Sequence, residues 1–255
     1  MKRSSQADLR ALLQSLGLPQ GGVYIVHSSL LRFGLIDGGL PAVLDTLWQV
    51  LGPGSSLLMP TFTFSYGQSR HWDLQRSKAE TGALSEHFRT QAGTLRTLHP
   101  MHSLAVAGPH AQAFADCRAL SSFGPGSPFA LLYDLDAWNI GLGTDFVGGA
   151  TFLHHAEQMA AVPYRFHKPF PGRVCGADGQ PLPQTFTMFA REIGADHAYS
   201  NRWDHVWHDM CAQGLVRQPQ PTAFAMRIRP AHDWLLARLQ ANPYHCAERV
   251  TTTTP

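Results

Sequence analysis

The sequence predicts an α/β fold in which a central, mostly parallel or mixed sheet is flanked by helices, within a single domain covering residues 1–255. Two observations lead to this fold class. Short apolar runs rich in β-branched residues alternate along the chain with amphipathic segments of helical length. In addition, 255 residues with 44% hydrophobic content are enough to bury one substantial core. The C-terminal part is less periodic, so we expect an irregular region there.

The first four predicted elements are a helix, a strand, a second helix and a second strand. They span residues 8–16, 23–26, 40–51 and 56–59. Leucines spaced three and four apart define the first helix, and Gly17 ends it. The strands are short continuous apolar runs, as in buried strands, and Gly38 and Gly52 flank the second helix. A strand, a helix and a strand within about 40 residues are typical of a parallel crossover unit.

Later segments extend this pattern. Apolar runs at 104–107, 137–143 and 223–228 are further strand candidates. The proline-rich stretch 163–187 indicates an extended excursion with strands, not a linker. The threonine-rich tail 251–255 is expected to be disordered.

Composition excludes several classes of protein. The net charge of +2, from 20 basic and 18 acidic residues spread along the chain, lacks the basic stripe of a nucleic-acid binder. No apolar run is long enough to span a membrane and the N-terminus lacks a signal-peptide pattern, so we expect a cytoplasmic protein. The four cysteines are scattered without a Cys-x-x-Cys pair, which indicates neither disulfides nor a cysteine zinc site. The 14 histidines instead favour metal or proton-transfer chemistry.

The segment Thr151–Glu157 holds the most specific arrangement of chemical groups. On a helix His154 and Glu157 share a face, whereas His155 points elsewhere. Such a pair could ligate a metal, but no second set of matching ligands is evident on another helix. It could also transfer protons, because a carboxylate fixes the tautomer of an imidazole and supports its charged form. A plain helix face is the third interpretation.

Three loops offer groups for binding an anion. The segment His27–Leu30 directly follows the first strand, so its hydroxyls and amides are placed at the carboxyl end of the sheet. A capping turn is an equally good interpretation of it. The stretch Arg96–Ser103 combines a guanidinium, hydroxyls and imidazoles, which suits an anion-binding loop or a solvated loop. Ser127 precedes a helix, where it could serve only as an N-cap.

Taken together, the ordered blocks of residues 23–165 resemble the aminoglycoside 3-N-acetyltransferase family, the antibiotic N-acetyltransferases that are unrelated to the GNAT fold. The segments that carry the resemblance are Val26–Leu30, Gly34–Gly39, Leu58–Thr63, Gly82–Arg89, Arg96–Ser103, Gly124–Pro128, Leu153–Glu157 and Val162–Arg165. Residues 169–255 match the family more loosely.

The resemblance implies a metal-free reaction in which an amine attacks the thioester of acetyl-CoA or another acyl-CoA. Residues 1–165 would bind CoA and catalyse, and residues 166–250 would form the acceptor pocket. In the family the histidine of the Leu-His-x-Ala-Glu block removes the proton from the attacking amine, and here it is His154. The positions implied to bind CoA are His27, Ser28, Ser29, Leu30, Arg96, Thr97, His99, Ser103 and Ser127. A donor near Ser29 or Thr97 would stabilise the tetrahedral oxyanion.

The C-terminal third bears on two further points. The family also uses an acidic residue from this region, so Asp204 is favoured narrowly as the partner of His154, and Glu157 as a contact of the substrate ammonium. The resemblance implies an aminoglycoside or amino sugar as acceptor. Basic residues between Arg165 and Arg202 instead fit a nucleotide- or lipid-linked amino sugar, or another biosynthetic amine. The expected partners are this amine and acyl-CoA, with a homodimer as one option.

Two hypotheses of other classes stay open. A histidine-rich, metal-dependent hydrolase would use His99, His102, His154 and His155. A catalytically silent CoA- or nucleotide-binding module would bind CoA tightly and turn over no thioester.

Overall fold

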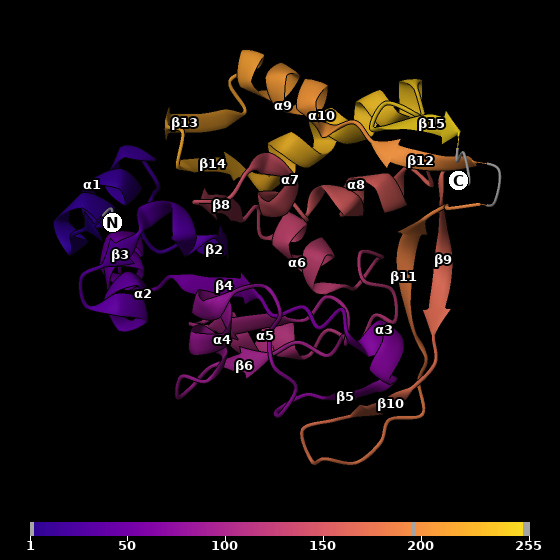
Figure 1. Cartoon of the computed structure of the whole chain (residues 1–255), viewed down its shortest axis with the longest axis horizontal. Coiled ribbons are helices and arrows are strands. Elements are labelled where there is room, and N and C mark those ends of the chain that lie inside the picture. The colour runs from indigo at the N-terminus through magenta and orange to yellow at the C-terminus, as the bar shows by residue number, and fades with distance from the viewer. Residues whose placement is uncertain (1–2, 195–196, 252–255) are drawn as a thin grey trace.

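A mixed seven-stranded sheet forms the centre of the protein (Figure 1). The computed structural model describes residues 3–194 and 197–251. In spatial order the strands are β13 (Val216–Gln220), β14 (Ala223–Arg227), β8 (Trp138–Leu142), β2 (Val23–Ser28), β4 (Ser56–Pro60), β7 (Leu104–Ala107) and β6 (Leu95–Arg96). β2 is parallel to β4 and β8, and the remaining neighbours pair antiparallel. The predicted α/β fold class is therefore confirmed.

Helices cover both faces of the sheet because successive side chains of a strand point to opposite faces. In β2, Val23 and Ile25 face one core, whereas Tyr24 and Val26 face the other. The face of Tyr24 is covered by α1 (Gln6–Ser15), α2 (Gly39–Leu51) and α4 (Ala83–Arg89). The face of Ile25 is covered by α5 (Ala111–Ala115), α6 (Pro128–Asp134), α7 (Phe146–Gly149), α8 (Leu153–Met159), α9 (Trp203–Ala212) and α10 (Ile228–Ala241).

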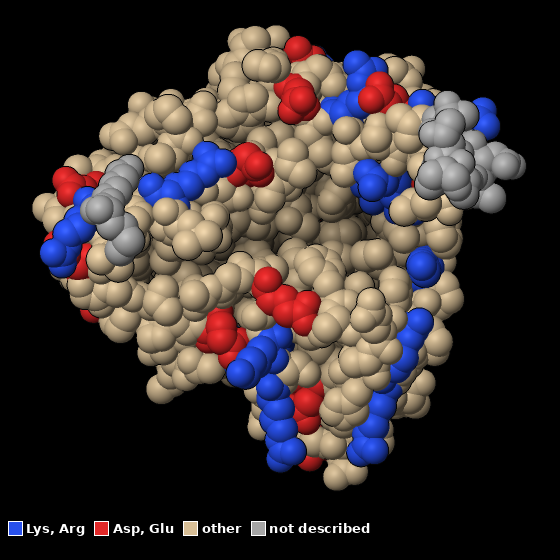
Figure 2. All heavy atoms as spheres, in the orientation of Figure 1, with Lys and Arg blue, Asp and Glu red and all other residues tan. Residues whose placement is uncertain are grey.

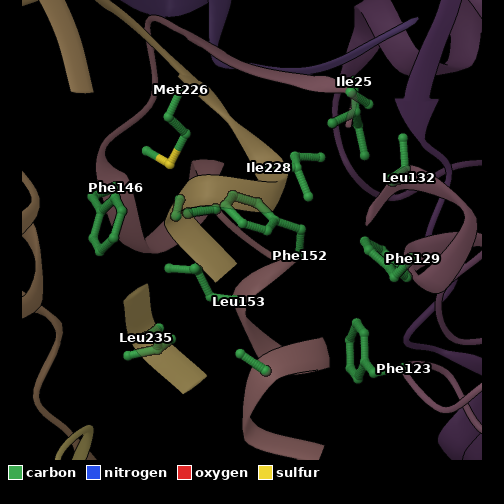
Figure 3. Close-up of a cluster of buried hydrophobic side chains, with 14 of the residues drawn as sticks. Ile25, Phe123, Phe129, Leu132, Phe146, Phe152, Leu153, Met226, Ile228 and Leu235 are labelled. Atoms are coloured by element: carbon green, nitrogen blue, oxygen red, sulfur yellow. The ribbon is translucent and has the colours of Figure 1, made fainter. Parts of the chain in front are cut away.

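The core on the Ile25 face determines where α8 lies. Leu153 and Ala156 of α8 are buried in the same cluster as Ile228 and Leu235 of α10 (Figure 3). Burying one large aliphatic side chain contributes roughly 1.5–3 kcal/mol to folding, so several of them hold this short helix firmly. The opposite side of α8 is left free to carry polar groups.

Outside the central sheet, the described residues form short two-stranded pairs. These are β1 (Arg3–Ser4) with β3 (Leu35–Ile36), β5 (His71–Asp73) with β10 (Arg173–Cys175), β9 (Arg165–Phe170) with β11 (Phe186–Arg191), and β12 (His197–Asn201) with β15 (Ala247–Thr251). Two short helices, η1 (Leu30–Phe33) and α3 (Tyr66–Ser69), complete the elements. The β9–β11 ribbon runs along one side of the molecule (Figure 1), and Phe170 and Phe186 pack at its lower end against Tyr66 and Trp72.

Most predicted elements are confirmed, with differences at their ends. β7 has the predicted bounds, and α1, α2, β4, β8 and β14 differ from prediction by at most two residues at either end. His27 and Ser28 do not form a turn but end β2, where they pair with Gly141 and Leu142 of β8. The C-terminal third is more regular than expected, because β13 and β14 continue the central sheet. The tail 252–255 lies outside the described residues.

Among the residues that the structure describes, no helix combines the length and the apolar character needed to cross a membrane.

Candidate active site

The arrangement predicted for α8 is present. His154 and Glu157 lie one turn apart on the same face, with His154 Nδ1 2.5 Å from Glu157 Oε2. His155 points elsewhere, because its Nδ1 lies 2.6 Å from the carbonyl oxygen of Phe123. Two adjacent positions of one helix therefore carry a site histidine and a structural one.

Glu157 is fully buried and is held by three side chains. Besides its contact with His154, it accepts a hydrogen bond from the Tyr164 hydroxyl at 2.6 Å, and Arg165 Nε lies 3.0 Å from its Oε2. Burial by itself would raise the pKa of Glu157, but Arg165, His154 and the Tyr164 hydroxyl together hold it below its ordinary value. Glu157 is thus an ionised carboxylate that accepts a hydrogen bond from the Nδ1–H group of His154. Its burial leaves no surface for the substrate-ammonium contact predicted for it, and that prediction is wrong.

The second ring nitrogen of His154, Nε2, is available to a substrate. It has no hydrogen-bond partner among the described residues and is not a buried atom, and 25% of the side chain is exposed. The ring lies between Phe123 and Trp203, with centroid distances of 5.2 and 5.8 Å. Burial and the charge of Arg165 lower the pKa of His154, although Glu157 opposes them. The imidazole is therefore neutral near pH 7, with an Nε2 lone pair that can accept a proton.

A cleft of about 770 Å³ opens beside His154, against the β9–β11 ribbon. Its described lining residues carry positive charge on Arg165, Lys168 and Arg191 and negative charge on Glu192. Arg165 is already in an ion pair with the carboxylate on α8, and Arg191 Nε is buried with no hydrogen-bond partner among the described residues. Figure 2 shows the molecule hollowed near its centre, with Lys and Arg side chains towards the side of this ribbon. The cleft thus places a proton acceptor beside an excess of positive charge.

Part of the predicted CoA site is accessible. Ser28, Ser29 and Leu30 are half-buried at the carboxyl end of β2. The backbone N–H of Ser29 donates to the carbonyl of Leu142 at 2.8 Å, which anchors the turn, and no hydrogen bond within the described residues engages either serine hydroxyl. His27 differs, because it is buried and burial lowers its pKa to about 4. Its ring faces the core, so the side chain is not open to a ligand in this structure, and a contact of His27 with CoA stays a prediction.

Arg96, predicted to bind CoA, is instead engaged inside the fold. Its guanidinium donates to the carbonyls of Ser77 and Thr61, both at 2.6 Å, and to Ser103 Oγ at 3.0 Å. The group also stacks on Trp72, with Cζ 4.8 Å from the ring centroid. Burial lowers its pKa to about 9. Distant segments of this chain use the donors of the guanidinium, so the structure offers no support for a contact with CoA, which stays a prediction.

Three further predicted CoA contacts are structural for the same reason. Thr97 Oγ1 accepts the backbone N–H of Leu104 at 2.8 Å, and Ser103 Oγ donates to the carbonyl of Thr61 at 2.8 Å. Ser127 caps α6, since its hydroxyl accepts the backbone N–H three residues along the chain at 3.2 Å. All three are fully buried. The N-cap interpretation of Ser127 is confirmed, whereas the CoA contacts of these residues and an oxyanion donor at Thr97 stay predictions that the hydrogen bonds do not favour.

His99 belongs to a buried chain of hydrogen bonds with His102 and Ser122. The backbone N–H of His102 donates to His99 Nδ1 at 3.1 Å, and His99 Nε2 lies 3.2 Å from the carbonyl oxygen of Thr187 and 3.2 Å from Ser122 Oγ. Ser122 Oγ is in turn 2.7 Å from His102 Nδ1. Both ring nitrogens of His99 are occupied by protein groups, so its contact with CoA stays a prediction that the structure does not favour.

The histidines of the metal-hydrolase hypothesis do not converge. His99 is engaged within the fold and His155 is turned to a backbone carbonyl, and of these four histidines His154 lines the cleft. Within residues 3–194 and 197–251, no cluster of three or more His, Cys, Asp or Glu side chains has the geometry to hold a metal ion. The donor set of this hypothesis is therefore not assembled.

Asp204 does not orient His154. It is exposed in the first turn of α9 and lines a separate cavity of about 250 Å³ with Arg32 and Thr144. The residue of α9 that contacts the imidazole is Trp203, which is buried. The preference for Asp204 is wrong because a helix turns each successive side chain by about 100°, so that its first residue faces α8 and its second faces solvent.

Two site residues, Tyr164 and Arg165, were missed as partners of Glu157. They reach it because the chain reverses after α8, where Ala161 has φ 49°. A left-handed residue of this kind leaves no clear mark in the sequence when it is not glycine. Their membership in the block Val162–Arg165 was the one available signal.

An α/β fold with a neutral histidine, held by a buried carboxylate at a cleft, defines the class of enzymes that use a histidine as general base. The family model for aminoglycoside 3-N-acetyltransferase matches residues 25–237. The chain belongs to the aminoglycoside 3-N-acetyltransferase family, and the resemblance found in the sequence is confirmed.

Individual relatives agree with this assignment. Aminoglycoside N(3)-acetyltransferase IV from Salmonella sp is 33% identical over 160 residues, which are 62% of this chain and 60% of that protein. Aminoglycoside acetyltransferase AAC(3)-Xa superposes with a TM-score of 0.80 at 25% identity, covering 93% of each chain. AAC-IIIb, solved as a binary complex with CoASH, superposes with a TM-score of 0.79 at 24% identity over 100% of each chain, a likeness of fold. The chain spans less than two thirds of the length of its Salmonella relative.

Proposed function

We propose that this protein is an acyl-CoA-dependent N-acyltransferase, which transfers an acetyl or other acyl group from coenzyme A to an amino group. The observation that carries the proposal is the state of His154, whose Nδ1 is held by buried Glu157 while Nε2 opens to the cleft. The family supports the acyl donor, because its members are named N-acetyltransferases and AAC-IIIb was solved with CoASH.

The reaction requires one proton acceptor at the cleft. As the neutral amine attacks the thioester carbon, the C–N bond forms and the carbonyl electron pair moves to oxygen. His154 Nε2 takes the proton that the nitrogen loses, and Glu157 stabilises the resulting imidazolium. When the intermediate collapses, the carbonyl reforms, the C–S bond breaks and the CoA sulfur receives the proton from His154. The base returns to its starting state.

The remaining part of the predicted CoA site is the turn after β2. Ser28 at the end of β2 and Ser29 in the turn carry hydroxyls that no hydrogen bond within the described residues engages, and Leu30 and the 93%-exposed Leu31 offer apolar surface. Ligands of open α/β sheets bind at the carboxyl ends of parallel strands, which here include β2, β4 and β8. We therefore assign CoA binding to this turn rather than to Arg96, Thr97, His99 and Ser103.

The acceptor has two candidates. The names of the relatives favour an aminoglycoside, in a resistance role. The cleft favours an amine that also bears an anionic group, such as a nucleotide- or lipid-linked amino sugar. Its described lining carries three positive side chains and one negative, and a polycation would meet Lys168 and Arg191 there. Guanidinium groups match phosphate and carboxylate geometry, so the same residues would attract such an amine.

The cosubstrate also bears on where the protein works. Acyl-CoA is a cytoplasmic metabolite, so we place the reaction in the cytoplasm. A homodimer stays a prediction, and light scattering of the purified protein would measure the oligomeric state.

His154→Ala tests the base. We expect kcat/KM for CoA-thiol release to fall by about a hundredfold or more, the usual contribution of a general base. Asp204→Asn is the matched control, because Asp204 is exposed and lines a different cavity, and its activity should equal that of the wild type. Unchanged thiol release in His154→Ala would contradict the assignment of the base.

A screen of amines identifies the acceptor. Acetyl-CoA and longer acyl-CoAs are offered with aminoglycosides and with glucosamine, glucosamine 6-phosphate and a nucleotide-linked glucosamine. An anionic acceptor predicts a higher kcat/KM for the phosphorylated sugar than for glucosamine, a preference that declines with ionic strength and in Arg191→Ala. Preference for aminoglycosides would overturn the second candidate, and thiol release with none of the amines would overturn the N-acyltransferase function itself.

A further inference from the structure

The buried chain of His99, Ser122 and His102 has a defined arrangement of protons. The backbone N–H of His102 donates to His99 Nδ1 at 3.1 Å, so this nitrogen carries no proton. The ring proton of His99 is therefore on Nε2, which donates to the carbonyl oxygen of Thr187 at 3.2 Å. His99 is a neutral imidazole in a single tautomer.

Ser122 in turn determines the tautomer of His102. Ser122 Oγ lies 3.2 Å from His99 Nε2, but that nitrogen is a donor, so the hydroxyl proton cannot be directed to it. The acceptors left are His102 Nδ1 at 2.7 Å and the carbonyl oxygen of Thr187 at 3.5 Å, and the shorter contact is the better hydrogen bond. The hydroxyl thus donates to His102 Nδ1, and the proton of the neutral His102 ring is on Nε2.

His102 Nε2 is the terminal ring nitrogen of this chain of hydrogen bonds. It has no hydrogen-bond partner among the described residues, yet it is not one of the buried unpartnered atoms, and His102 keeps 6% of its surface. Its ring packs beside exposed Phe64 and beside Phe123, at centroid distances of 5.8 and 4.8 Å. Phe123 also packs on His154 at 5.2 Å. His102 and the base therefore flank the same phenyl ring.

The surroundings of His102 suit a donor that keeps its proton. Burial, together with the positive charge of Arg165 and the repulsion that His99 and His154 would exert if protonated, lowers the pKa of His102 well below its ordinary value. A neutral N–H group stabilises a developing negative charge by hydrogen bonding without becoming an acid.

We propose that His102 donates its Nε2–H to the carbonyl oxygen of the bound thioester and stabilises the oxyanion that forms when the amine attacks. This assignment rests on the N-acyltransferase function proposed above. It supplies the donor that Thr97 cannot provide, because the Thr97 hydroxyl is engaged inside the fold. His102 forms and breaks no covalent bond, since the proton of the amine still travels through His154.

His102→Phe tests the proposal, because phenylalanine suits the aromatic surroundings and removes the donor. We expect kcat to fall by about a hundredfold to a thousandfold, as for the loss of one oxyanion donor, with little change in the KM for acyl-CoA. His102→Gln should recover part of kcat, since its side-chain amide can donate. Ser122→Ala should give an intermediate loss, because the second tautomer of His102 becomes accessible. His208→Phe, on the exposed face of α9, is the matched control.

The pH profile separates the role of oxyanion donor from a structural role and from the role of general base. The acid limb of kcat/KM belongs to His154, so it should stay in place in His102→Phe while kcat falls. Any one of three results for a folded His102→Phe would overturn the proposal. These are a kcat within threefold of the wild type, a change in KM alone, and the loss of the acid limb. If this variant does not fold, a wild-type kcat in both Ser122→Ala and His102→Gln would overturn the proposal. If the wild type releases no thiol, the N-acyltransferase function itself is refuted. If the wild type is active and His154→Ala is inactive, but the His102 variants behave like the wild type, only the role of His102 is refuted.

Discussion

At the scale of single residues, the site depends on one buried carboxylate. An unpaired carboxylate in the interior costs several kcal/mol, and Glu157 avoids this cost through Arg165 and two hydrogen-bond donors. The same contacts hold His154 in the tautomer that exposes Nε2. Stability and catalysis therefore share these residues, so activity assays of their variants need a parallel measurement of folding.

Arg165 shifts the pH dependence of the reaction. A protonated His154 cannot act as base, so kcat/KM falls as the pH drops through its pKa, which burial and Arg165 hold below the ordinary value near 6.5. Removing the positive charge in Arg165→Met should raise this pKa and move the acid limb of kcat/KM to higher pH. Lys168→Met is the control, because Lys168 is exposed and its charge is screened by solvent. An acid limb that moved to lower pH would contradict this account.

At the scale of elements, the start of α6 distinguishes a cap from a binding contact. The Ser127 hydroxyl accepts the N–H of Ala130, and its loss in Ser127→Ala should lower the free energy of unfolding by about 1 kcal/mol. The KM for acetyl-CoA should not change. Ser5→Ala, at the capping box of α1, should show a loss of similar size in urea unfolding. A raised KM without a loss of stability would return Ser127 to the CoA site.

At the scale of the whole molecule, buried histidines make stability depend on pH. Burial lowers the pKa values of His27 and His99 to about 4, whereas in the unfolded chain they are near the ordinary 6.5. Between these values the unfolded state binds protons that the folded state excludes, so stability falls as the pH drops from about 6.5 to 4, by on the order of 3 kcal/mol for each histidine.

His27→Leu measures this contribution. Because the variant cannot take up the proton, its free energy of unfolding by urea should change less between pH 7 and pH 5 than that of the wild type. His208→Leu, on the exposed face of α9, should keep the wild-type pH dependence. Equal pH dependence in His27→Leu and the wild type would show that His27 titrates normally in the fold.

The sequence by itself determined the elements and the pair at the centre of the site. Periodicity is a local property, so the apolar runs that became β2, β4, β7 and β8 were recognisable without their partners. His154 and Glu157 were predictable as neighbours because helical spacing within one element brings them together.

Only the tertiary structure decided which polar groups face the cleft and which are used inside the fold. Arg96 and Asp204 carry the chemistry expected of site residues, but the first is engaged by carbonyls from distant segments and the second is turned to solvent. The proton on His102 likewise depends on Ser122, twenty positions along the chain. A sequence shows which donors and acceptors a chain carries. Which of them remain free depends on segments that meet only when the chain has folded.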